Sequence, residues 1–474
     1  MTLVEKTTVG LLAVLAMAFG HDHAAFAQVP ATPMAIGEVV DAASKDLPAV
    51  AEAAARASAA SAAIGEFRAA YLPRVDGLWQ LNRASRNNVF GLLLPQSIVP
   101  AISGPVLGTD SFESAWGSAA GLLFSAEVFD FGRRSATVDA ARAQASASEA
   151  QLSLARLNAG IAAADAYLAA LGAQQTVVAA RANVARLETL QGTVKAQVDA
   201  ELKPGADQSR IDAETAAARN RLVAAEQALA LAKLAIAQAV GRPDLDLVLV
   251  PASLLTNQPA RTTSAETGSP EHPAITAATR AVTAAEMKRE ATARAFRPRF
   301  LFNGALAARA SGASVDGTID NGHGLWPDVP NWAAGLTVSF PFLDLTANRA
   351  RLAVEAADTA ASQARLQGAV QRRRIETRQA DVLLDAAAKM AANIPAQLSA
   401  ARQADAQARA RYEAGLTGIV EVADAQRLLA QAETEDALAS LAVWRARLAQ
   451  AAAHGDLTAF LTEAAMPTGP RVKP

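Results

Sequence analysis

The sequence predicts a mixed α/β membrane protein in which α-helices predominate. Three observations support this fold class: the composition is 51% hydrophobic but only 5% aromatic, two helical patterns are too long for a globular core, and four segments alternate apolar with polar residues. The apolar residues are mostly alanine, which favours long helices that pack closely. A net charge of −2 gives no reason to expect nucleic acid as a partner. The absence of cysteine excludes disulfides and thiolate metal sites.

Residues 1–27 have the pattern of a secretory signal peptide. Lys6 precedes an apolar run over residues 9–19, and residues 25–27 form an Ala-x-Ala cleavage site. A membrane anchor is the alternative, but the run is well short of the roughly 20 residues that a spanning helix needs. No later segment looks apolar enough to cross a membrane as a helix, so we expect an exported protein without a transmembrane helix.

The rest of the chain is an internal repeat of two similar halves. LPAVAEAAARASAASAAIGEFRAAYLPRV and HPAITAATRAVTAAEMKREATARAFRPRF each place a helical pattern between two prolines 25 positions apart, Pro48 and Pro73 in the first and Pro273 and Pro298 in the second. Proline suits the first turn of a helix and the first residue of a strand. The halves then match with an offset of two residues, which indicates an insertion in the first half near KPGADQ. The predicted divisions are a first repeat over residues 28–241, a linker over 242–270, a second repeat over 271–462 and a flexible tail over 463–474.

Each half contains a helical pattern of unusual length. In the first half about 70 residues separate Arg133 from the next helix break, which corresponds to about 105 Å at 1.5 Å per residue. That break reads KPG and contains Pro204 and Gly205, while its counterpart, RYEAGLTGIVEVADAQRLLAQAE, is interrupted at Gly415 and Gly418. Because glycine and proline inside a helical pattern mark turns, each half is predicted to form a long helical hairpin that turns at these residues.

Four segments alternate apolar and polar residues with the period of a β-strand. Trp79, Leu122, Leu306 and Leu336 fall on one face, and polar residues such as Asn303 fall on the other. About ten residues of such alternation, with Trp near strand ends, is typical of a membrane β-barrel, although an ordinary half-buried sheet has the same period. The predicted strands cover about residues 72–83, 114–128, 298–310 and 332–342.

Four strands cannot close a barrel in a membrane. Known barrels have at least eight strands, and unpaired strand edges are prohibitive in lipid because their backbone groups find no partners there. The chain must therefore oligomerise. Three copies would give twelve strands and, with two helical hairpins each, a twelve-helix tube, but the spacing alone does not choose three copies over two or four.

Several stretches resemble the TolC-like outer-membrane efflux protein family, over about residues 36–461. The resemblance rests on the two units bounded by prolines, on LLFSAEVFDFGRR and LTVSFPFLDLTANRA, and above all on RYEAGLTGIVEVADAQRLLAQAE, which is similar to the family's Tyr-x-x-Gly turn. It implies a homotrimer with a twelve-stranded β-barrel in outer-membrane lipid and a twelve-helix α-barrel that extends into the periplasm. It implies no cofactor.

The resemblance also implies a function. The chain would be the outer-membrane channel of a tripartite efflux pump, which passes small molecules such as drugs or metals from the periplasm to the exterior. Its partners would be a periplasmic adaptor protein and an inner-membrane transporter. The outer-membrane channel of a type I protein secretion system remains an alternative, and the sequence does not name the cargo.

By the same resemblance, the second hairpin turn lies at a periplasmic gate. Tyr412, Glu421 and Asp424 match positions where the family places the closed-state constraints and an acidic constriction, and Asp207 is a weaker candidate because the insertion blurs its register. Thr417 stands where some members have an arginine, which puts an ionic latch in doubt. The simpler interpretations are that Tyr412 packs at a turn, and that acidic residues three positions apart on one helical face favour the helix dipole.

Two other classes fit the sequence less well. An exported coiled-coil structural protein would show sustained heptads and no strands. An enzyme has little support, because the kinase-like DFG triplet at residues 130–132 has no Gly-rich or catalytic loop near it and is explained by a strand-to-helix turn. His272, His323 and His454 are far apart in the sequence, so no metal site is predicted.

Overall fold

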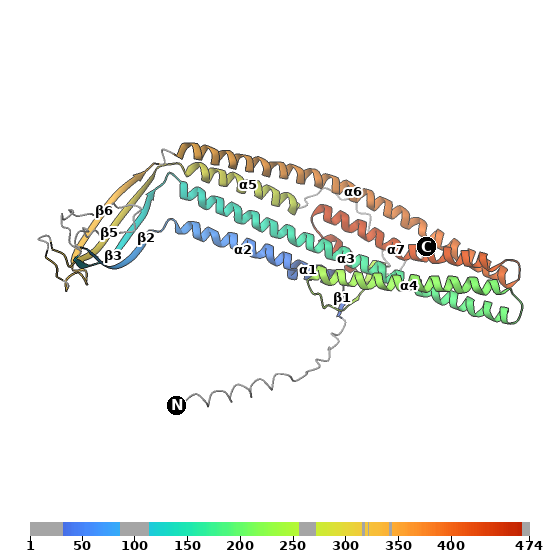
Figure 1. Ribbon diagram of the computed structural model, residues 1–474. Helices are drawn as coiled ribbons and strands as arrows, with labels where there is room; N and C mark the ends of the chain where they lie inside the picture. Colours follow the sequence, from blue (N-terminus) through green and yellow to red (C-terminus); the bar gives the residue numbers. More distant parts are fainter. Residues whose placement is uncertain are drawn as a thin grey trace, which may run out of the picture.

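The computed structural model describes residues 32–85, 113–255, 272–314, 318–320, 322–340 and 344–466. Figure 1 shows an elongated molecule with a β-sheet at one end, helices along its length and two helix-to-helix turns at the other end. The mostly helical fold with a separate β-sheet is confirmed. The predicted signal peptide lies outside the described residues.

The same order of elements occurs twice along the chain. In each half a helix, two strands and two further helices follow one another, and the equivalent long helices α3 and α6 have 67 and 69 residues. The first set is α2 (Pro48–Ala69), β2 (Arg74–Ser85), β3 (Ser114–Phe129), α3 (Arg133–Asp199) and α4 (Gly205–Val240), and the second is α5 (Pro273–Arg294), β5 (Arg299–Ser311), β6 (Val329–Ser339), α6 (Leu345–Glu413) and α7 (Ile419–His454).

Four helices form a single curved layer next to the sheet. They lie side by side in the order α2, α3, α5 and α6 (Figure 1). Alanines such as Ala57, Ala141 and Ala284 are buried between them, and these small side chains let the helices approach closely. The 67 residues of α3 rise over about 100 Å. Pro395 lies inside α6, where it removes one backbone hydrogen bond and favours a bend.

The sheet is antiparallel, in the order β2, β3, β5 and β6. Its register places Leu122 opposite Leu306, and Leu306 opposite Trp332. The predicted apolar face therefore exists, and it is open: Leu306 is 63% exposed and Trp332 is 80% exposed. On the other face Ser125 donates a hydrogen bond to Asn303 at 3.1 Å. Four strands thus present one apolar and one polar face, with no further layer of the described residues covering the apolar one.

A small compact region surrounds the middle of α3. It contains a two-stranded parallel sheet and a core in which Trp444 packs edge to face against Phe460 at 5.9 Å between ring centres. The Tyr167 hydroxyl lies 2.7 Å from the carbonyl oxygen of Val250 and accepts the N–H of that residue at 3.1 Å. The elements are β1 (Thr32–Met34), α1 (Ile36–Asp46), β4 (Leu247–Leu249), a 3-10 helix (Ala252–Leu255) and α8 (Thr458–Ala465).

Several elements of this region lie in parts of the chain for which the sequence showed no structure. Strand β4 lies within residues 242–270, the expected linker, and pairs with β1 more than 200 residues earlier. Helix α8 extends to Ala465, beyond the expected start of the tail at residue 463. Segments of three to eight residues carry too little periodicity to be read from the sequence alone.

Helices α4 and α7 each end directly against the start of another helix. Gly241 ends α4 with φ +76° and Gly455 ends α7 with φ +78°. A Cβ atom at Gly241 would lie 3.0 Å from Pro48 Cδ, and one at Gly455 would lie 2.8 Å from Pro273 Cδ. The left-handed backbone angle and the close approach both require glycine. Helix α4 therefore abuts α2, and α7 abuts α5.

One expectation about hydropathy is wrong. Among the described residues, α4 is long and apolar enough to cross a membrane by length and composition, with a mean hydropathy of 1.4 over its most apolar stretch. However, α4 runs alongside α3 at the end of the molecule far from the sheet (Figure 1). Alanines together with larger side chains such as Leu231 and Leu234 give α4 this hydropathy, and length and composition alone do not place it in a membrane.

Candidate functional site at the hairpin turns

Both hairpin turns have the same backbone geometry. In the second turn, the N–H of Gly415 bonds Tyr412 O at 3.0 Å and the N–H of Leu416 bonds Arg411 O at 2.8 Å. This pair of bonds is a Schellman motif, in which the residue after the helix cap takes a left-handed conformation. Gly415 has φ +73°, whereas Gly418 has an extended backbone and caps α7.

The first turn forms the same motif without glycine at the left-handed position. The N–H of Glu201 bonds Val198 O and the N–H of Leu202 bonds Gln197 O, both at 2.9 Å. Glu201 has φ +56°, a conformation that costs a residue with a Cβ atom about 1–2 kcal/mol. Pro204 caps α4 and Gly205 is its first residue, so neither supplies the left-handed position.

The predicted insertion between the halves is wrong. Ala200 ends α3 70 residues after Asp130, and Ala414 ends α6 70 residues after Asp344. The two turns are therefore in register, and Asp207 and Glu421 both occupy the third position of the helix that follows. An alignment of the two halves slips easily here, because one alanine in an Ala-rich helix resembles another.

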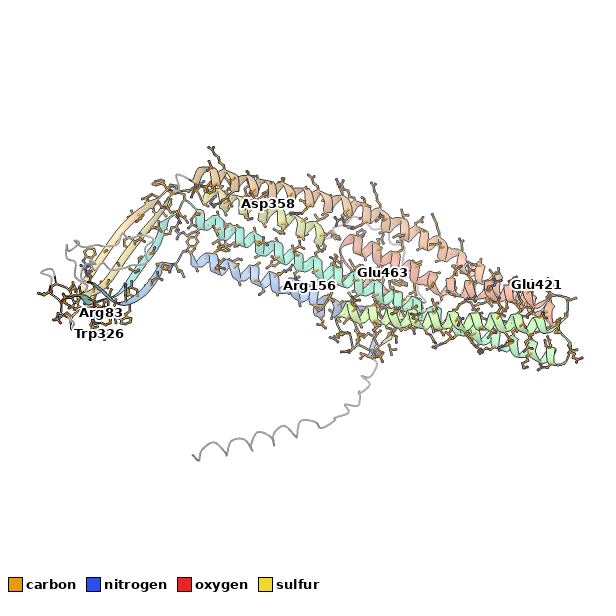
Figure 2. All side chains as sticks on the ribbon, viewed as in Figure 1. Arg83, Arg156, Trp326, Asp358, Glu421 and Glu463 are labelled. Atoms are coloured by element: carbon orange, nitrogen blue, oxygen red, sulfur yellow. The ribbon has the colours of Figure 1, made fainter. Side chains whose placement is uncertain are left out.

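Glu421 and Asp424 share one exposed face of α7, while Val422 and Ala425 face inward. Figure 2 shows Glu421 at the end of the molecule opposite Arg83 and Trp326. Each carboxylate has an arginine partner in its own chain. Arg411 lies 3.0 Å from Glu421, which also accepts a hydrogen bond from Thr417, and Arg427 pairs with Asp424.

Tyr412 and Asp207 are brought together from different hairpins. The Tyr412 side chain is only 2% exposed, and its hydroxyl lies 3.5 Å from Asp207 Oδ2. Burial raises the pKa of Tyr412, and the nearby Asp207 carboxylate adds to the increase. Lys203 lies over the ring, with Nζ 4.6 Å from the centre of the Tyr412 ring. Glu421 and Asp424 pair instead with Arg411 and Arg427 of their own hairpin, so the four predicted residues form two groups.

An apolar cluster surrounds the Tyr412 ring and joins the two hairpins. Val194 and Ile211 come from the first hairpin, and Ile419 and Val422 come from the second. Farther along the helices, Arg186 of α3 and Glu433 of α7 form an ion pair at 2.7 Å. The hairpin tips of one chain are therefore fixed to each other mainly through buried apolar contacts and a few polar links.

The sequence did not indicate a buried polar group next to the tip. Gln426 is 2% exposed and donates to Asp405 at 2.8 Å, and Asp405 also accepts from Arg409 at 3.1 Å. The signal that could have found it is a Gln on the inward face of an otherwise Ala-rich helix. Among the described residues, no group of three or more His, Asp or Glu side chains is placed to hold a metal ion.

Comparison with known proteins finds similarity over most of the chain. The model of a family described as "Outer membrane efflux protein" matches residues 39–242 and 270–456. These two matched segments leave out the region between the repeats. A comparison with curated proteins yields no match.

Solved structures with the same fold include several outer-membrane channels. The outer-membrane channel OprN shares 23% identity with a TM-score of 0.71, and 89% of each chain is covered. The CmeC outer membrane channel of Campylobacter jejuni shares 16% identity with a TM-score of 0.71, covering 89% of this chain and 85% of its own. The outer membrane protein VceC of Vibrio cholerae shares 19% identity with a TM-score of 0.70, covering 89% and 96%.

Proposed function

Because the chain belongs to the outer membrane efflux protein family, we propose that it is the outer-membrane channel of a tripartite efflux pump. It would carry small molecules, such as drugs or metals, from the periplasm to the exterior, together with a periplasmic adaptor and an inner-membrane transporter. The observation that supports this role best is the sheet whose apolar face is open, joined directly to a wall of long helices. A soluble protein would cover such a face.

The edges of the sheet support assembly as a trimer. Within the described residues, β2 pairs with β3 alone and β6 pairs with β5 alone. In lipid both free edges need partners, and the β6 edge of one subunit can meet the β2 edge of the next. Three chains would close a barrel of twelve strands, above the minimum of eight. Their helices would continue this barrel as a tube of twelve helices.

A groove along the helical layer supports a water-filled path. Side chains of α2, α3, α5 and α6 line it, and half of these are alanines. Four of the six charged residues among them form ion pairs: Arg56 with Glu52 at 2.5 Å and Lys288 with Glu355 at 3.1 Å. A lining of small side chains and mostly paired charges lets varied solutes pass without holding any one tightly. In the trimer this groove would face the central tunnel.

The hairpin tips would form the periplasmic gate. Tyr412 and Asp207 would hold the tips of one subunit in the closed arrangement, and Glu421 and Asp424 of three subunits would line the mouth. The contact between Tyr412 and Asp207 supports the first role. The exposure of both carboxylates supports the second, although their arginine partners reduce the net negative charge at the mouth.

The proposal can be tested by isolating the complex of this chain with its partners from cells. The tagged chain, cross-linked in cells and purified in detergent, should retain an adaptor and an inner-membrane transporter, and native mass spectrometry should show three copies of the chain. A transporter of the protein-secreting class would favour type I secretion instead. A monodisperse monomer with no co-purifying partner would rule out both the barrel and the channel.

A further inference from the structure

The turn between α3 and α4 sends one side chain back onto the second hairpin. Glu201, Leu202, Pro204 and Gly205 are exposed, but Lys203 between them is half-buried. The left-handed conformation of Glu201 redirects the chain at this point. As a result the Lys203 ammonium lies 4.6 Å from the centre of the Tyr412 ring, within the range of a cation–π contact.

Lys203 and Asp207 reach Tyr412 from the same hairpin by different chemistry. Asp207 meets the hydroxyl at 3.5 Å, which is long for a hydrogen bond between oxygen atoms. Lys203 meets the face of the ring instead, where the ring quadrupole attracts a cation. Because the Tyr412 side chain is 2% exposed, water competes little for this contact. The hydroxyl bond alone is therefore a weak link, and the lysine supplies a second one.

We propose that Lys203 is a positioning residue of the gate: its ammonium on the Tyr412 ring holds the second hairpin of a subunit against the first in the closed arrangement. This role rests on the proposed channel function. The role also fits the residues at the second turn. Thr417 stands at that turn, and Arg411 and Arg427 pair with carboxylates of their own hairpin. The first hairpin contributes the cation that joins the two.

The functional test compares open probability in planar bilayers for purified trimers. Lys203→Met keeps the aliphatic stem and removes the charge, Lys203→Arg keeps the charge, and Lys195→Met is the matched control, since Lys195 pairs on the surface of α3 with Asp199. We expect the ratio of open to closed channels to increase about fivefold per subunit in Lys203→Met, in line with an ordinary cation–π contact. Lys203→Arg and Lys195→Met should behave like the parent.

Variants of Tyr412 separate the ring contact from other roles of Lys203. In a Tyr412→Leu background, which lacks the ring, Lys203→Met should have no further effect. In a Tyr412→Phe background, which lacks only the hydroxyl bond to Asp207, the effect of Lys203→Met should persist. An equal increase in the Tyr412→Leu background would show that Lys203 acts through another contact, and would overturn the proposal.

A second readout does not depend on conduction. The sequence contains no cysteine, so cysteines at Leu202 and Leu416, which are 74% and 72% exposed in the two turns, can carry spin labels. The distance between the labels should broaden in Lys203→Met and stay narrow in Lys203→Arg. An unchanged distribution in Lys203→Met would refute the latch. A broadened distribution in a protein that forms no channel would refute the channel function and leave the contact established.

Discussion

Glu201 and Gly415 occupy equivalent positions in the two hairpin turns, yet only Gly415 suits the backbone angle that both adopt. Each lies directly after the capped end of a helix with a left-handed φ, +56° for Glu201 and +73° for Gly415. A residue with a Cβ atom is strained there because the Cβ approaches the following carbonyl oxygen. The surrounding Schellman bonds hold Glu201 in place despite this cost.

Substitutions at these two positions should have opposite effects. Glu201→Gly removes the strain and should raise the free energy of unfolding by about 0.5–1 kcal/mol, after the greater freedom of glycine in the unfolded chain is counted. Gly415→Ala introduces the same strain, removes the freedom of glycine in the unfolded chain, and should lower the free energy of unfolding by about 0.5–1 kcal/mol. Apparent melting temperatures of the purified protein measure both, and shifts of equal sign would contradict this account.

The charges at the proposed mouth offer a second pair of opposed variants. Replacing Glu421 and Asp424 by Ala should reduce cation selectivity and divalent-cation block. Replacing Arg411 and Arg427 by Gln removes the arginine partners of the carboxylates and should increase both. Reversal potentials across a KCl gradient in planar bilayers measure the selectivity. If the acidic pair only begins a helix, neither double variant will differ from the parent, and trimer assembly serves as the control.

At the scale of elements, the passage from β3 to α3 is fixed by one carboxylate. Asp130 accepts the N–H of Gly132 at 3.0 Å and both the N–H and Nε of Arg134 at 2.8 Å. The Arg134 guanidinium in turn lies 4.6 Å from the centre of the Tyr71 ring. The turn therefore ties the end of the strand, the start of α3 and the segment after α2 together. The equivalent Asp344 is exposed and makes no such cap.

This network predicts a pH dependence of stability. Burial alone would raise the pKa of Asp130, but the hydrogen bonds and charge of Arg134 and the N–H of Gly132 outweigh it and hold the pKa below its usual value. The carboxylate therefore stabilises the fold above the ordinary Asp pKa, and this contribution is lost as the pH falls through the lowered one.

Asp130→Asn should cost about 1–3 kcal/mol at pH 7, because it leaves buried donors without a carboxylate. The difference from the parent should shrink as the pH is lowered below about 4. Apparent melting temperatures from pH 7 to pH 2 measure it, with the exposed Asp344→Asn as the control. A difference that stays constant over this range would show that the charge of Asp130 is unimportant.

The two faces of β6 give a matched test of the membrane assignment. Leu336 is 64% exposed on the apolar face, and Thr337 follows it on the polar face. Leu336→Arg should destabilise the barrel by about 2–4 kcal/mol, the cost of arginine against lipid, whereas Thr337→Arg should be tolerated. The amount of assembled trimer in outer-membrane fractions measures both. Equal losses from the two variants would indicate an ordinary sheet.

For the molecule as a whole, the strand and helix ends lie at opposite extremes (Figure 1). If the sheet is in the outer membrane, the loops near residues 87–110 and 311–328 face the exterior and the helical turns face the periplasm. The first loop and part of the second lie outside the described residues. The long helices then extend away from the membrane. Their length exceeds what a globular domain needs and suits a tunnel across the periplasm.

Cysteine labelling tests this orientation. Cysteines at Ser103 and Ser314 should react with an impermeant reagent in intact cells, whereas one at Thr417 should react only after the outer membrane is permeabilised. Because the chain has no cysteine of its own, each signal belongs to one position. Labelling at Thr417 alone in intact cells would invert the proposed orientation.

Much of the candidate site could be named from the sequence, but its contacts could not. The break in helical periodicity located both turns, and the i and i+3 spacing placed Glu421 and Asp424 on one face. The contact between Tyr412 and Asp207, 205 residues apart, depends on how the hairpins pack. The roles of these residues at a gate stay predictions.

The sequence by itself determined the elements of this protein: the long helices, the alternating strands and the doubling of the chain all follow from local periodicity, which each segment carries alone. Only the tertiary structure decided the register of the two turns, the pairing of β1 with β4 and the placing of Lys203 on the ring of Tyr412. These are relations between segments far apart along the chain. The contacts between these segments are stabilised by packing in the folded chain. Alanine-rich helices resemble one another, so the local sequence does not indicate which residues will meet.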